Sequence, residues 1–164
     1  MNPYSQEELI SIEKQKKINE DMESFFEKER VKWNNEITPL LETLKIDFNI
    51  GNAPKVIEVQ SLALSFRQRI AEETSLFMER RSKAMVKIKK VRQDKFLFYA
   101  TNFGVKTNMG EKTILIEAHL SELLRSTELI ENYIEYLRTC NKTLESIGFV
   151  IKNTIELHNY LGKN

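Results

Sequence analysis

Basic and aromatic side chains follow one another closely in the middle of this chain. Residues 87–99 hold five Lys or Arg residues and three aromatic rings, and Phe103 follows a few positions later. Cationic groups neutralise phosphates and exposed rings accept unstacked bases, so this combination suits single-stranded nucleic acid. Basic patches are common, however, and Phe96 and Phe98 also fit a hydrophobic core beside solvated lysines. The candidate nucleic-acid-binding residues are Lys87, Lys90, Arg92, Lys95, Phe98, Tyr99 and Phe103, with Phe96 expected in the core.

The overall charge of +1 hides an uneven distribution along the 164 residues. Residues 66–95 contain 10 basic and 4 acidic residues, whereas residues 1–65 contain 8 basic and 12 acidic residues. We call residues 66–95 the basic island. Such a region indicates a polyanionic partner, although a solvated helix face can be equally basic.

Sequence patterns for catalysis or metal binding are missing. The chain has no glycine-rich phosphate loop, and its two histidines, His119 and His158, lack the spacing of a zinc-binding helix. The single cysteine, Cys140, excludes an internal disulfide and is expected as a buried small side chain. We therefore expect a protein with no enzymatic activity, no cofactor and no metal site.

The sequence also carries no sign of export or membrane insertion. Its first residues lack the charged-then-apolar pattern of a secretion signal, and no apolar run approaches about 18 residues. We expect a cytoplasmic protein that does not bind a membrane.

The composition predicts a mainly all-α fold of long helices in an elongated hairpin. Only 5 Gly and 3 Pro are present, so turns are few, and Glu, Lys, Leu and Ile favour helices. Pro39 is expected to kink or break the first helix near Thr38. Residues 113–116 fit either a short strand or a helix start. The expected helices are residues 5–45, 55–99 and 120–161, separated by connectors at 46–54 and 100–112.

Each expected helix carries one narrow line of apolar residues at helical spacing. Lines this narrow are typical of paired helices that complete their burial by self-association, so a homo-oligomer is expected. The expected core positions are Met22, Phe26, Trp33, Ile37, Leu40 and Leu44, then Val59, Leu62, Phe66, Ile70, Phe77, Ala84, Ile88, Val91 and Phe98, and then Ile130, Ile134, Leu137, Leu144, Ile151 and Ile155.

Two segments resemble the UvsY family of phage recombination mediators. Residues 92–99 are similar to that family's basic and aromatic segment, and residues 148–162 are similar to its carboxyl-terminal ending. The resemblance covers roughly residues 55–162, in the expected order. Two departures stand out: Gln93 lies where the family often has a basic residue, and residues 1–50 have no counterpart.

The resemblance implies a protein that binds single-stranded DNA as a ring-shaped homo-oligomer. It would help to load a RecA-like recombinase onto DNA covered by single-strand binding protein during recombination and DNA repair. As a bacteriophage protein it would act in the cytoplasm of the host cell. The implied domains are an N-terminal helical extension, residues 1–50, and a UvsY-like DNA-binding and oligomerisation core, residues 51–164. Two alternatives stay open: an architectural or virion coiled-coil protein, and a helical adaptor for an acidic protein partner.

Overall fold

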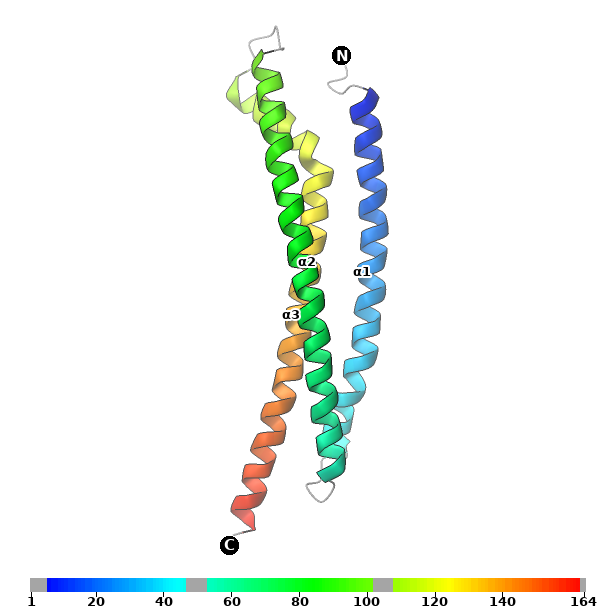
Figure 1. The fold of residues 1–164 in the computed structure, drawn as a ribbon, viewed down its shortest axis with the longest axis vertical. Coiled ribbons are helices and arrows are strands. Elements are labelled where there is room, and N and C mark those ends of the chain that lie inside the picture. Colours follow the sequence, from blue (N-terminus) through cyan, green and yellow to red (C-terminus); the bar gives the residue numbers. More distant parts are fainter. Residues whose placement is uncertain (1–5, 47–52, 102–107, 163–164) are drawn as a thin grey trace. The chain divides into compact units, whose positions relative to one another are not determined.

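Three long α-helices make up the part of the chain that the computed structural model describes, residues 6–46, 53–101 and 108–162 (Figure 1). They are α1 (Gln6–Ile46), α2 (Ala53–Thr101) and α3 (Met109–Leu161). The prediction of an all-α fold is confirmed, and no strand occurs in these ranges. Residues 113–116 belong to α3, so the helical alternative holds there.

Helix α3 begins about eleven residues earlier than the sequence pattern predicted. Asn108 forms a reciprocal capping arrangement with Glu111: the Asn108 side-chain oxygen accepts from the Glu111 backbone N–H at 2.9 Å. The Glu111 carboxylate in turn accepts from the Asn108 backbone N–H at 3.2 Å. This capping box satisfies N–H groups that a helix start leaves unpaired. The prediction that residues 100–112 form a loop was therefore wrong at both ends, and residues 102–107 lie outside the described part.

Helix α1 continues through Pro39, so of the kink or break predicted near Thr38 the break does not occur. Proline removes one backbone hydrogen bond and costs about 3 kcal/mol inside a helix. Apolar side chains on both sides of it are buried, with Trp33 1%, Ile37 6% and Leu40 6% exposed. Fully burying such a side chain gains about 1.5–3 kcal/mol each, which exceeds the cost of the proline.

By their contacts, the described residues divide into two compact units that each contain parts of all three helices. Unit 1 takes the residues within Met1–Phe26 and Phe77–Tyr133, and unit 2 takes those within Glu27–Leu76 and Ile134–Asn164. The division into residues 1–50 and 51–164 implied by the resemblance follows other boundaries and stays a prediction.

The core of unit 1 contains an aromatic cluster with one ring from each helix. Phe26 of α1 stacks on Tyr133 of α3 with ring centroids 4.4 Å apart, and Phe77 of α2 lies edge-on to both at 5.2 Å. Offset and edge-on pairs of this kind add about 0.5–1.5 kcal/mol to the free energy of burial. The three helices are thus fixed together at this level of unit 1.

A buried polar group sets the register of α1 against α3 in unit 1. The Asn19 side chain is fully buried and donates to the Glu122 backbone oxygen at 2.8 Å and to the Glu122 carboxylate at 2.9 Å. It also accepts from the Ser126 hydroxyl, which in turn accepts from Gln15 at 2.9 Å. Sliding α1 by one turn would leave these buried groups unpaired, which is costly.

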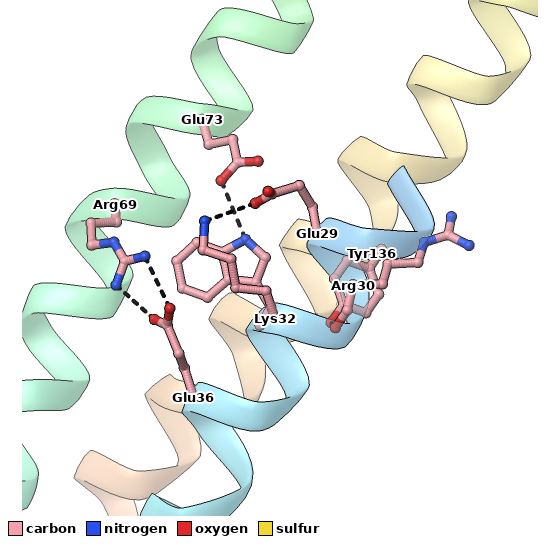
Figure 2. Close-up of polar contacts among 8 residues, drawn as sticks. Glu29, Arg30, Lys32, Glu36, Arg69, Glu73 and Tyr136 are labelled. Atoms are coloured by element: carbon pink, nitrogen blue, oxygen red, sulfur yellow. Dashed lines mark hydrogen bonds and ion pairs between the residues drawn. The ribbon is translucent and has the colours of Figure 1, made fainter. Parts of the chain in front are cut away.

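In unit 2, Trp33 of α1 packs into the core while its polar edge is held by α2. The indole N–H donates to the Glu73 carboxylate at 3.2 Å, and the Arg69 guanidinium lies 4.8 Å from the indole ring. Figure 2 shows Arg69 reaching across to Glu36 with two parallel bonds, at 2.7 and 3.3 Å. This bidentate pair and the cation–π contact clamp α1 to α2 within unit 2.

Most expected core positions are buried, because the apolar lines follow the helical repeat. Three of them are exposed: Leu62, Phe98 and Ile155, at 40%, 45% and 42%. Five are half-buried: Met22, Leu44, Phe66, Ala84 and Val91. The buried ones are Phe26, Trp33, Ile37, Leu40, Val59, Ile70, Phe77, Ile88, Ile130, Ile134, Leu137, Leu144 and Ile151.

Candidate nucleic-acid interface

The described candidate binding residues all lie on the part of α2 that belongs to unit 1, and Phe103 lies outside the described residues. Lys87 and Lys90 are exposed. Within residues 6–46, 53–101 and 108–162, neither ammonium group forms an ion pair. These two are the candidate cations without an internal ion-pair partner in the described ranges.

Arg92 and Lys95 have carboxylate partners inside the protein. Arg92 contacts the Glu117 carboxylate of α3 at 2.8 Å, and both side chains are about half exposed. Lys95 pairs with Glu8 of α1, and its side chain is only 16% exposed. Lys95 lies seven residues after the buried Ile88, which at 100° per residue is about 20° from the same line. The lysine is therefore drawn into the space between the helices.

The aromatic rings of this segment are placed differently from the prediction. Tyr99, expected as a stacking platform, is 2% exposed, and Phe96, expected in the core, is 43% exposed. The reason is helical phase: Tyr99 follows Ile88 by eleven residues, close to three full turns, whereas Phe98 follows it by ten and lies about 80° away. The predicted line of core residues passes through Val91, which is only half-buried. Seven residues after Val91 this line reaches Phe98 and not Tyr99.

Tyr99 is part of a hydrophobic cluster between α2 and α3. Its buried neighbours are Ile88, Ile116 and Leu120, with further half-buried apolar residues around them. It therefore contributes to the fold of unit 1, and Phe98 is the ring of this pair that reaches solvent, at 45% exposed.

One exposed face of α2 combines the available cations with Phe98. Four basic residues lie within about 80° of one another around the helix, and Phe98 falls about 20° from Lys87 on the same face. The face extends about 27 Å along the helix axis at 1.5 Å per residue. Asp94 is an acidic member of it. We call the four cations the basic stripe: Arg80, Lys83, Lys87 and Lys90.

The two earlier members of the stripe already make surface contacts of their own. The Arg80 guanidinium lies 5.0 Å from the Phe77 ring, and Lys83 pairs with Glu79 one turn before it at 2.6 Å. Exposed pairs of this kind are weak and leave both cations accessible to a competing anion. The stripe thus offers several phosphate contacts followed by one aromatic platform.

A small cavity lies beside the stripe, between α1, α2 and α3 of unit 1. Its volume is about 200 Å³, and Lys87, Lys95, Glu8 and His119 are among the residues that line it. The Glu8 carboxylate oxygen that contacts Lys95 also lies 3.3 Å from His119 Nε2. Burial lowers the pKa of His119, and the Lys95 charge lowers it further, while Glu8 opposes both.

Glu8 and His119 were missed as site residues. Glu8 is 87 positions from Lys95 in the sequence, and local spacing does not show that α1 brings it there. His119 was considered alone because no second histidine or cysteine lies near it in the sequence. The sequence pointed to this site only indirectly: Lys95 falls close to the core line of α2, and a buried lysine requires an anionic neighbour.

The single cysteine lies in the core of unit 2. Cys140 is 7% exposed, and burial raises the pKa of its thiol, which disfavours the reactive thiolate. One turn earlier, the Tyr136 hydroxyl contacts the Arg30 backbone oxygen at 3.0 Å and Asn34 at 2.9 Å. The Tyr136 contacts join α3 to α1 in this unit.

Among the described residues, no group of three or more His, Cys, Asp or Glu side chains is placed to hold a metal ion. No helix in these ranges has an apolar stretch long enough to cross a lipid bilayer. Comparison of the chain with protein-family models, with curated proteins and with solved structures finds no match.

Proposed function

We propose that this protein binds single-stranded DNA through the basic stripe and Phe98, and that it acts as a recombination mediator. The observation that carries the proposal is the exposed pair Lys87 and Lys90, which have no ion-pair partner in the described ranges and share a face with an exposed ring. Lysines contact phosphates of any sequence, and an aromatic face stacks on any base. Binding is therefore expected to tolerate sequence and to weaken with salt.

The mediator role rests on the resemblance of residues 92–99 and 148–162 to the UvsY family. In this role the protein loads a RecA-like recombinase onto DNA that is covered by single-strand binding protein. One protomer offers only a few phosphate contacts. A ring-shaped homo-oligomer multiplies such weak sites through a high effective concentration, and the strand follows the ring from one protomer to the next.

An apolar face near the end of α3 supports the proposed self-association. Five large apolar side chains between residues 149 and 161 are 45–69% exposed, and no charged residue separates them on the outer side of the helix. Contiguous exposed apolar patches mark interaction sites on many proteins. The five residues are Phe149, Val150, Leu157, Tyr160 and Leu161.

The binding site is tested with a charge-matched pair of double variants. Lys87→Gln with Lys90→Gln removes two stripe cations, and Lys14→Gln with Lys17→Gln removes two exposed cations at the same spacing on α1. Each lost phosphate contact reduces the salt slope of binding by about 0.7, so the stripe variant should lose about 1.4 in slope and about 25-fold in affinity at 0.1 M salt. The α1 variant should stay near wild type. Equal losses in both would refute the assignment to the stripe.

The mediator role needs its own assay. Recombinase filaments are assembled on a single strand that is first covered by single-strand binding protein, with and without this protein. Wild-type protein should shorten the delay before assembly, and the Lys87 and Lys90 variant should not. Wild-type protein that binds bare DNA but leaves the delay unchanged would refute mediation while leaving DNA binding intact.

A further inference from the structure

The cavity beside the basic stripe contains a carboxylate in a position that suits a phosphate. One oxygen of Glu8 contacts both the Lys95 ammonium and the His119 imidazole, the latter at 3.3 Å. Carboxylate and phosphate oxygens are both anionic acceptors, and lysine and imidazole N–H groups donate to either. We infer that Lys95 and His119 form a further phosphate-binding position of the same interface, which the Glu8 carboxylate fills when no DNA is bound. The inference rests on the proposed function.

The position is continuous with the exposed stripe. Lys87 belongs to the stripe and also lines the cavity, so the stripe and the position formed by Lys95 and His119 share one side chain. The Lys95 ammonium also lies 5.6 Å from the centre of the Phe98 ring. A base stacked on Phe98 thus brings the neighbouring phosphate toward the lysine.

Among Glu8, Lys95 and His119, the Glu8 carboxylate is the group that a phosphate can displace. It lies in the first turn of α1, and its side chain is 31% exposed. Helix ends fray, and partly exposed ion pairs contribute little to stability. The other carboxylate that lines the cavity, Glu122, accepts from the buried Asn19 at 2.9 Å and is held in place. DNA therefore competes with Glu8 for the two donors, and α1 limits the affinity of the free protein.

The experiment compares Glu8→Gln with Glu7→Gln, which removes the same charge from the adjacent exposed position. The binding of a labelled single-stranded oligonucleotide is titrated at several salt concentrations. One added phosphate contact should raise the affinity of the Glu8 variant about fivefold at 0.1 M salt and steepen its salt slope by about 0.7. The Glu7 variant should keep the wild-type slope. Adding Lys95→Gln to Glu8→Gln should remove the gain.

The outcomes separate this inference from the proposed function. If wild-type protein binds the oligonucleotide and the two single variants behave alike, the displaced-carboxylate site is refuted while the stripe stands. If neither wild-type protein nor any variant binds, the proposed function itself fails. Circular dichroism of each variant checks that the helices are intact, and a Glu8 variant that is folded but binds more weakly than wild type also overturns the inference.

Discussion

The neighbouring rings Phe98 and Tyr99 give a sharp test of how α2 is oriented, because alanine at each position should have a different effect. Tyr99 is 2% exposed and lies in the cluster with Ile88, Ile116 and Leu120. Truncating a buried aromatic side chain to alanine removes its transfer free energy and leaves a cavity, at a cost of about 3–5 kcal/mol. Tyr99→Ala should therefore lower the free energy of unfolding by about that amount.

Phe98→Ala should cost much less stability. The ring is 45% exposed and makes two contacts of known kind: an edge contact with Tyr99 at 5.5 Å and the cation–π contact with Lys95 at 5.6 Å. Each contact is worth about 0.5–1 kcal/mol, so the total loss is about 1–2 kcal/mol. Under the proposed function the same variant should lose about 1–3 kcal/mol of binding free energy for the base that no longer stacks.

Urea unfolding followed by circular dichroism measures the free energy of unfolding. Fluorescence anisotropy of a labelled oligonucleotide measures the free energy of binding. Tyr99→Phe is the control, because it keeps the buried ring. A Tyr99→Ala protein that is as stable as Phe98→Ala would refute the helical phase of α2. A Phe98→Ala protein with wild-type affinity would refute the aromatic platform.

Three further predictions concern stability. Asn19→Ala should lower the free energy of unfolding by about 1–3 kcal/mol in urea titrations, because the half-buried Glu122 oxygens and the buried Ser126 hydroxyl lose a partner; a loss below about 0.5 kcal/mol would contradict this. Arg69→Ala should cost about 1–2 kcal/mol and change the emission of Trp33, the only tryptophan, since the guanidinium lies over the indole. Because burial lowers the pKa of His119, the unfolded chain binds this proton first, so stability should fall as pH drops below about 6.5. His119→Gln should flatten that dependence, and an unchanged pH profile would refute the role of the histidine.

The helices and most of their core positions were predictable, because apolar residues at helical spacing carry this information locally. The start of α3 was missed because the pair Asn108 and Glu111 was not recognised as a capping box. The predicted core line ended on Phe98, whereas Tyr99 is the buried ring. A line followed in seven-residue steps along a helix drifts by about 20° per step. Val91 already lies about 60° from Ile88 around the helix, and the drift leaves Phe98 about 80° from it, outside the core.

The candidate site was less predictable than the fold. The basic stripe follows from spacing alone, because its members share one helix. The contacts of Glu8 with Lys95 and His119 join three helices, and the sequence holds no local pattern for them. Charge composition treats Lys95 and Lys87 alike, whereas burial and an internal carboxylate distinguish them.

The most direct measurement of the proposed function is a salt titration of wild-type protein with a labelled single-stranded oligonucleotide of mixed sequence. Four stripe cations that each contact one phosphate predict a logarithmic slope of about −2.8 per protomer, with similar affinity for a second, unrelated sequence. Failure to bind at low salt, or binding that does not change with salt, would contradict the assignment of the basic stripe to single-stranded DNA.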